Sequence, residues 1–309
     1  MRNLNKLIIA LAIVSFSSPA QSGLAQTQDD NSRQIVLDSF TNARPPKTSA
    51  STAGGGRTRP PSVRKPPTYR RVGKPSLAST SRANEELGIT VWRLRPSKQN
   101  DTGARLLVME NSQSSQWTPE RIEVDTPLAV GDRVRISVES PRAGFLYVVD
   151  REQFQDGTFG DPYLIFPTTR TRGGDNRVRP GKLIDIPAQE DNPSYFTLIP
   201  SPTRSDQVAE VLSFIVTPAP LNNLAIGDRP LKLSPADVAK WEQLWSSEVE
   251  RFEMNGGAGR TWTPEEKAAG AMAGSRLLNQ EEPTPQTVYR FARRNRSTVL
   301  VTVPLRYGR

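Results

Sequence analysis

Four carboxylates stand within one short stretch, residues 150–161, where they could bind a cation or transfer protons. They are Asp150, Glu152, Asp156 and Asp161. Oxygen ligands on a loop that contains glycine suit Ca²⁺, and two neighbouring carboxyl groups can act as acid and base in hydrolysis. Their spacing does not follow the EF-hand pattern, and Asp156-Gly157 is a common hairpin-turn sequence. We therefore predict a turn here. A calcium site at Asp150, Asp156 and Asp161 and a carboxylate-dependent hydrolase are the alternatives.

A second polar stretch, residues 168–179, is rich in arginine and contains two adjacent glycines. Its arginines are Arg170, Arg172, Arg177 and Arg179. Guanidinium groups and open backbone amides can hold a carboxylate, phosphate or sulfate. Asp175 and acidic residues of neighbouring loops can instead absorb these charges in surface ion pairs. We predict a solvated loop with a local ion pair, and the alternative is a site for an anionic ligand or partner at the four arginines.

Two residue types with frequent catalytic roles are missing, because the chain contains no cysteine and no histidine. Thiolate nucleophiles, disulfides, serine–histidine triads and histidine-bound zinc are therefore excluded. Lys240 and Lys267 have no serine that the sequence places beside them, so a Ser/Lys hydrolase has no support. An enzyme would have to use carboxylates, lysine, tyrosine or an oxygen-ligated metal. We predict a protein that is not an enzyme and that carries no cofactor.

Three tryptophans could bind carbohydrate if their rings were exposed. Trp241 and Trp245 follow Val238 at three-to-four spacing, which is typical of the apolar stripe of a helix. Aromatic side chains on such a stripe usually pack into a core. We predict core roles for Trp241 and Trp245, and the carbohydrate platform, with Trp262 as a third ring, is the alternative.

The elements that position these residues are mostly short strands. Val134, Ile136 and Val138 alternate with polar residues, as in a half-buried strand. Strands are predicted at 89–94, 105–108, 133–138, 144–150, 163–167, 182–187, 195–199 and 210–216. Proline, glycine and aspartate turns separate them without intervening helices. The pattern predicts a mainly β fold, an antiparallel β-sandwich of immunoglobulin-like or related type, with a closed barrel as the alternative.

The C-terminal part, residues 223–309, has a different period. Ser234-Pro235 predicts the start of a helix that continues to Phe252, and Thr263-Pro264 predicts a second helix to about Leu278. Segments 287–291 and 298–303 then predict a C-terminal β-hairpin. We expect a small two-helix insertion and this hairpin to pack on the sandwich of residues 88–222, and a separate subdomain is the alternative.

The N-terminus has the features of a secretory signal peptide over residues 1–25. Arg2 and Lys6 precede an apolar run at 7–16, and small residues follow, so that cleavage fits after Ala20 or Ala25. The apolar run is too short to span a hydrocarbon core of about 30 Å. We predict export to the periplasm or beyond the cell, with no integral membrane segment after cleavage.

Residues 26–87 resemble a linker in composition. Of these, residues 26–82 hold eleven basic and three acidic side chains, whereas residues 83–309 hold 28 basic and 29 acidic ones. Lys/Arg-Pro-Pro sequences recur and apolar residues are scarce, which predicts a disordered, basic, polyproline-like leader. We interpret it as a spacer, and the alternative is a tether for an anionic polymer such as a wall polymer, lipopolysaccharide or nucleic acid. Arg59-Pro60-Pro61 also resembles a polyproline ligand for an aromatic groove.

The order of several short motifs carries a resemblance to a known family. They are Pro127-Leu128-Ala129-Val130-Gly131-Asp132-Arg133-Val134-Arg135, Gly144-Phe145-Leu146-Tyr147-Val148, the Asp156-Gly157 turn, Leu164-Ile165-Phe166-Pro167, and the segments 181–187, 195–200 and 211–217. Residues 88–222 resemble the bacterial family called domain of unknown function 4384. The resemblance implies a β-sandwich that accompanies exported or signalling proteins, and it implies no catalytic residues.

These observations together predict an exported, non-catalytic interaction or scaffold module of the cell envelope. Its expected partner is an envelope or extracellular protein or another envelope component. The alternatives are a metal- or carboxylate-dependent hydrolase that uses the 150–161 loop, and an anionic-polymer binder that acts through the basic leader.

Overall fold

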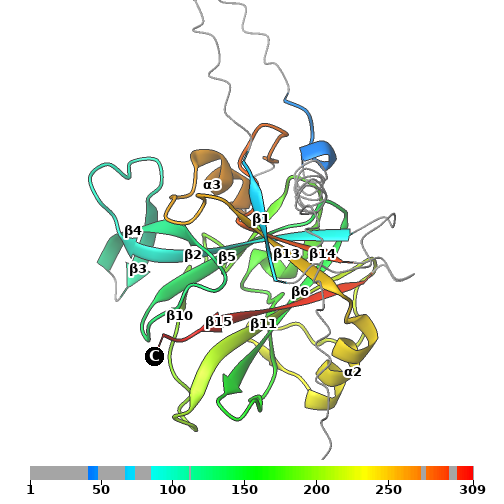
Figure 1. Cartoon of the computed structure of the whole chain (residues 1–309). Coiled ribbons are helices and arrows are strands. Elements are labelled where there is room, and N and C mark those ends of the chain that lie inside the picture. Colours follow the sequence, from blue (N-terminus) through cyan, green and yellow to red (C-terminus); the bar gives the residue numbers. More distant parts are fainter. Residues whose placement is uncertain are drawn as a thin grey trace, which may run out of the picture.

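The computed structural model describes residues 41–47, 67–73, 85–110, 113–272, 276–291 and 298–308. The predicted signal peptide and most of the predicted leader lie outside these residues. The protein is mainly β, with 42% strand and 11% helix arranged around two antiparallel sheets. The predicted mainly β fold is therefore confirmed, and Figure 1 shows how the two sheets stack.

The larger sheet is organised around β2, which pairs with β14 and then β4 along one edge and with β5 along the other. The path runs β1-β13-β14-β2-β4-β3, and β5 carries β9 and β10. Its strands are β1 (Tyr69–Val72), β2 (Glu85–Pro96), β3 (Leu106–Glu110), β4 (Gln113–Ile122), β5 (Arg133–Glu139), β9 (Leu183–Ile186), β10 (Phe196–Thr197), β13 (Val249–Met254) and β14 (Thr287–Phe291).

The smaller sheet follows the order β12-β7-β6-β11-β15, and β8 pairs with β6. Its strands are β6 (Gly144–Phe154), β7 (Tyr163–Phe166), β8 (Arg177–Val178), β11 (Gln207–Thr217), β12 (Leu231–Lys232) and β15 (Val299–Arg306). Among the described residues, η1 (Arg172–Gly174), α2 (Pro235–Trp245) and α3 (Pro264–Gly270) lie outside the sheets, and residues 41–43 are also helical.

The main core lies between the two sheets, because alternate side chains of a strand point to the same face. Ile89 and Ile136 from the larger sheet meet Val148, Phe214 and other apolar residues from the smaller one. All four are fully buried. The outer face of the smaller sheet is covered by α2, whose Val238 packs with residues such as Ile215. The outer face of the larger sheet is covered by α3 and by the chain that precedes β14 (Figure 1).

The predicted first helix is wrong beyond Trp245. At Ser246 the backbone leaves helical angles (φ −57°, ψ 137°), and residues 249–254 form β13 instead. Val249 and Phe252 fit a helical period, but the backbone of β14 finds its second hydrogen-bonding partner in this segment. The second helix begins at Thr263 as predicted, with a capping box to Glu266, yet it ends at Gly270 rather than near Leu278. The two helices are therefore not a continuous insertion, since a strand of the main sheet separates them.

The predicted C-terminal hairpin is also wrong. β14 pairs with β13 and β2 in the larger sheet, whereas β15 pairs with β11 in the smaller sheet. Both strands contribute apolar side chains to the same core from opposite sides. Their alternating pattern is that of strands, and it contains no information on which sheet each strand joins.

The predicted linker, residues 26–87, is wrong at three described places. The first predicted strand starts at Glu85 rather than near Gly88, so β2 includes the last three residues of the predicted linker. Residues 67–73 include β1, which adds to the edge of β13, and residues 41–47 dock through a buried Arg44. These attachments depend on strand pairing by four residues and on one buried arginine, so the average composition of the stretch gave no sign of them. No helix among the described residues is long and apolar enough to cross a membrane.

Candidate functional site

The outer face of the larger sheet carries an unusual number of buried charges. On β5, Arg135, Ser137 and Glu139 alternate with the core residues and point away from the core, yet all three are at most 5% exposed. The cover of α3 and the 276–286 segment removes them from water. Buried charges are costly unless they are paired and hydrogen-bonded, so each of them requires a partner on this face.

Arg44 is the partner of Glu139. The Arg44 Nε and Nη2 atoms each donate to one oxygen of the Glu139 carboxylate at 2.7 Å. The remaining N–H groups donate to main-chain carbonyls at 2.8–3.2 Å, and these belong to Asn279, Glu282 and Pro283. Five hydrogen bonds thus match the five donors of a guanidinium group. The Arg44 side chain is fully buried, although it comes from a segment predicted to be a linker.

Other contacts hold the backbone and neighbours of Arg44. Gln280 Nε2 donates to the Arg44 carbonyl at 3.2 Å, and Lys47 pairs with Glu281 at 2.7 Å on the surface. The Pro45 ring packs against Gly181, where an added Cβ would lie 3.3 Å from the Pro45 Cδ atom. Residues 44–47, which follow a helical turn at 41–43, are therefore held through a charged side chain, a backbone carbonyl and a proline ring.

Tyr69 of β1 contacts the same covering segment. Its hydroxyl donates to the Pro285 carbonyl at 2.5 Å and lies 2.8 Å from the Thr284 hydroxyl. β1 itself pairs with β13, so Tyr69 packs with Phe252 and Met254 in a small apolar cluster. Both described N-terminal segments thus meet residues 279–285, although 19 residues separate them in sequence.

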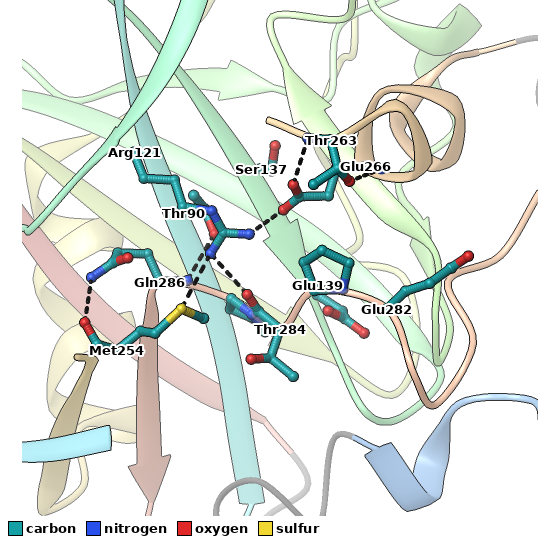
Figure 2. Close-up of polar contacts among 12 residues, drawn as sticks. Thr90, Arg121, Ser137, Glu139, Met254, Thr263, Glu266, Glu282, Thr284 and Gln286 are labelled. Carbon is teal, nitrogen blue, oxygen red and sulfur yellow. Dashed lines mark hydrogen bonds and ion pairs between the residues drawn. The ribbon is translucent and has the colours of Figure 1, made fainter. Parts of the chain in front are cut away.

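A second buried ion pair, Arg121–Glu266, lies behind the first. Figure 2 shows Arg121 of β4 reaching the Glu266 carboxylate of α3 and the Thr284 carbonyl, which is 2.9 Å away. The Glu266 carboxylate also accepts from the Thr263 backbone at 2.9 Å as part of the capping box. The Arg121 guanidinium stacks on the Trp92 ring at 5.1 Å. In the same view the 41–47 segment is the blue ribbon at the lower right.

A small cavity separates the two ion pairs. Thr90, Ser137, Glu139, Glu266, Thr284 and nearby prolines and leucines line it. It has room for about one water molecule, which is far less than a small-molecule substrate requires. The arrangement is suited to holding a guanidinium group in place.

Two further pairs continue the charged layer. Arg135 donates to Asp185 at 3.1 Å, Ser137 donates to the same carboxylate at 2.6 Å, and burial lowers the pKa of Arg135. Arg290 pairs with Glu86 at 3.1 Å, and burial raises the pKa of Glu86 to about 7. For Arg44, burial alone would lower the pKa, and the Glu139 carboxylate raises it above its ordinary value.

The predicted acidic constellation does not converge. The Asp156-Gly157 turn is confirmed, with Gly157 at φ 82°, and Asp156 accepts from the Thr158 amide and from Arg204. Asp161 pairs with Lys232 on the surface. Asp150 lies elsewhere, on the core-facing side of β6. Over the described residues, no three acidic side chains stand where they could hold one metal ion, so the calcium interpretation gains no support.

Asp150 instead lies near an acidic residue, Glu210, on the paired strand β11. Burial, and then the charges of Glu210 and Glu152, raise the pKa of Asp150 to about 8. Burial also raises the pKa of Glu210, which accepts from Gln207 at 2.8 Å and from Tyr307 at 3.4 Å. Burial and the neighbouring negative charges thus favour the protonated form of both carboxyl groups, as they do for many catalytic acids.

The predicted arginine loop lies around η1. Arg177 pairs with Asp175 at 2.8 Å, and Arg172 donates to the Asp175 carbonyl at 3.3 Å. Arg170 instead donates to the Asn192 carbonyl on another loop, and Arg179 is exposed. The predicted local ion pair is present, whereas the four arginines are not gathered around one point. An anionic ligand at this loop stays a prediction.

The tryptophans divide between core and surface. Trp262 is buried and donates to the Ala104 carbonyl, and it packs edge-on against Trp92. Trp241 and Trp245 stack on each other at 5.7 Å and pack against the apolar cluster under α2, but both stay partly exposed. The predicted core role thus holds in part for the helical pair.

Sequence reasoning missed Arg44 and Glu139. Glu139 follows the outward alternation of β5, which is usually a solvent position. The Arg44-Pro45-Pro46 tripeptide recurs as Arg59-Pro60-Pro61, and that repetition was the available signal for a recognised motif.

Comparison with known proteins adds no relative. No protein-family profile matches the chain, and neither the curated proteins nor the solved structures contain a match. The resemblance of residues 88–222 to domain of unknown function 4384 therefore stays a prediction.

Proposed function

We propose that this chain is an exported, non-catalytic interaction module of the cell envelope that binds a protein or another envelope component. Export is supported by the charged start, short apolar run and small residues of positions 1–25. The non-catalytic role is supported by the missing histidine and cysteine. It is also supported by the way in which the buried charges pair with one another beside a cavity of about one water molecule.

The observation that carries the proposal is the docking of two N-terminal segments on the sandwich. β1 adds to the free edge of β13, which is the geometry of strand addition, and Arg44 inserts as a charged anchor. A domain that holds peptide segments in these two ways has the surfaces that an interaction module uses. Here the peptide is its own chain.

A pull-down from envelope extract tests this proposal. The bait is the mature chain, compared with a variant in which Arg57, Arg59, Arg64 and Lys65 are changed to glutamine. If the folded domain recognises the partner, both baits should retain that partner at high salt, because salt screens buried contacts only weakly. Loss of the partner with the variant, or its release by salt, would instead place recognition in the basic leader and support anionic-polymer binding.

The Asp150–Glu210 pair favours a second candidate, a carboxylate-dependent hydrolase in which Asp150 is the acid. Its raised pKa would keep a proton available near neutral pH. The test is hydrolysis of a panel of glycosides, esters and peptides by the mature chain. Activity that disappears in both Asp150→Asn and Glu210→Gln supports this candidate, whereas no activity in the unchanged chain removes it.

A further inference from the structure

We propose that Glu139 and the carbonyls of residues 279–283 form a receptor for an Arg-Pro-Pro peptide segment, which residues 44–46 of the same chain occupy in this structure. The inference deepens the proposed function and rests on it, since it gives the interaction module a site and a ligand class. The ligand class is an extended peptide in which arginine precedes two prolines.

The receptor is selective for arginine over lysine. It offers two carboxylate oxygens and three carbonyl oxygens, and these are arranged around a planar group with five donors. A lysine ammonium has three donors at a single point, so it cannot reach both Glu139 oxygens and the carbonyls on the other side. At least two acceptors would be left without partners in a site closed to water, which costs affinity.

The two prolines suit the peptide to this site. Proline restricts its own backbone and that of the preceding residue to extended conformations, so little conformational entropy is lost on docking. The Pro45 ring lies against Gly181, which adopts φ 75° and has no side chain to obstruct it. Gln280 meanwhile binds the carbonyl between arginine and proline.

The receptor also requires a cation. Glu139 is 1% exposed, and the Arg44 guanidinium is the cation that it contacts. Without a guanidinium the carboxylate would stay buried and unpaired, which is strongly unfavourable. The site therefore has a strong tendency to be filled, by this segment or by an equivalent one.

An equivalent segment is present in the chain itself. Arg59-Pro60-Pro61 repeats the tripeptide and lies outside the described residues. The described residues thus form one such receptor, and the sequence contains two Arg-Pro-Pro tripeptides. We propose that Arg59-Pro60-Pro61 is the segment that can replace residues 44–46 in the receptor. When the replacing segment belongs to another copy of the chain, it links the two copies.

The test uses the full chain with both tripeptides disabled, Arg44→Ala/Arg59→Ala, and a synthetic peptide of residues 40–48. We expect the variant to melt below the unchanged chain and its Tm to rise with the logarithm of peptide concentration. A peptide with lysine in place of Arg44 should bind at least about tenfold more weakly. A peptide of residues 57–63 should compete. The unchanged chain should need far more peptide, because its own segment is present at high effective concentration.

The matched control is the triple variant that adds Glu139→Gln, which keeps the shape of the receptor and removes its charge. We expect the peptide to leave its Tm unchanged. If the double variant does not fold, Arg44→Lys provides the same measurement, since the arginine peptide should displace the weaker lysine and raise Tm.

Two outcomes overturn the proposal. One is a folded Arg44 variant that no concentration of the arginine peptide stabilises, which would make Arg44 a structural ion pair only. The other is equal stabilisation of the triple variant, which would place the peptide elsewhere. Neither outcome affects the envelope pull-down, so a failed receptor leaves the broader function open to its own test.

Discussion

The outer faces of the two sheets are covered in opposite ways. Over the smaller sheet, α2 places Val238 and two stacked tryptophans on an apolar surface that includes Tyr147 and Ile215. Over the larger sheet four ion pairs are buried, namely Arg44–Glu139, Arg121–Glu266, Arg135–Asp185 and Arg290–Glu86. The first three are in contact with α3 or the 276–286 segment. The same sandwich thus has an apolar cover on one face and an ionic cover on the other.

The difference shows how a cover can select one chain segment and fix its position. Apolar burial has no preferred direction, so α2 stays in place through the area that it removes from water. An ion pair in a closed site tolerates little displacement, because a buried charge without its partner is strongly unfavourable. The ionic cover therefore fixes one segment, residues 41–47, at one register, which the apolar cover would not do.

The largest expected effect comes from breaking the ionic cover on one side only. Arg44→Ala should lower the free energy of unfolding by about 3–5 kcal/mol, because Glu139 is left buried and unpaired. Adding Glu139→Gln should restore much of this loss, since the orphaned charge is gone. Urea unfolding of the single and double variants measures both values. Equal stability of the two variants would contradict the assignment of the loss to Glu139.

A smaller and purely additive loss in the free energy of unfolding is expected in the apolar cover. Val238→Ala removes two buried carbons beneath α2 and should cost about 2 kcal/mol. No second substitution on this face should restore the stability as Glu139→Gln does on the other, because no group is left uncompensated. A double-mutant cycle with Arg44→Ala, read by urea unfolding, should be additive, since the two sites lie on opposite faces. Strong coupling between them would show that the two covers do not act independently.

The sequence predicted the apolar packing of the two sheets better than the buried ion pairs of the ionic cover. Alternation in residues such as Val134, Ile136 and Val138 fixes which face is buried, and the pattern is local. The helical prediction is wrong at Val249 and Phe252 because both residues fit either period, and only pairing with the edge of β14 that β2 leaves open decides between them. The sheet that a strand joins depends on distant partners, which explains the wrong hairpin.

The candidate site was hidden for a related reason. Glu139 occupies a position of β5 that would face water in a two-layer sandwich, and it is buried only because the 276–286 segment returns over it. Arg44 is one of ten basic residues between positions 44 and 82. Nothing in its immediate neighbours marks it as the one that finds a carboxylate, apart from the prolines that follow. Pairs separated by 95 residues cannot be read from composition.

A pH measurement compares the paired carboxylates of the ionic cover with Asp150, whose neighbour is another carboxyl group. The pKa of Asp150 is raised to about 8 from an ordinary value of 3.8, so the folded state holds a proton that the unfolded state releases. Stability from this group is fully present below about pH 4 and is lost as pH rises through 8. We expect Tm to fall by several degrees between pH 5 and pH 9. Asp150→Asn should flatten this fall, and Glu86 and Glu253, whose pKa values burial also raises, should maintain the remainder.

The smallest expected effect is also the sharpest check on the ionic cover. Lys47 and Glu281 form an ion pair three residues along from Arg44, but both side chains are more than half exposed. Lys47→Ala should cost about 0–1 kcal/mol, and 0.5 M salt should remove the difference, because exposed pairs are screened. The loss in Arg44→Ala should persist in the same salt, since its carboxylate is closed to ions. If Lys47→Ala were as damaging as Arg44→Ala, or if salt abolished both losses, then general attraction between a basic segment and an acidic surface would hold residues 41–47 in place. The guanidinium geometry of the receptor would then have no role in the docking.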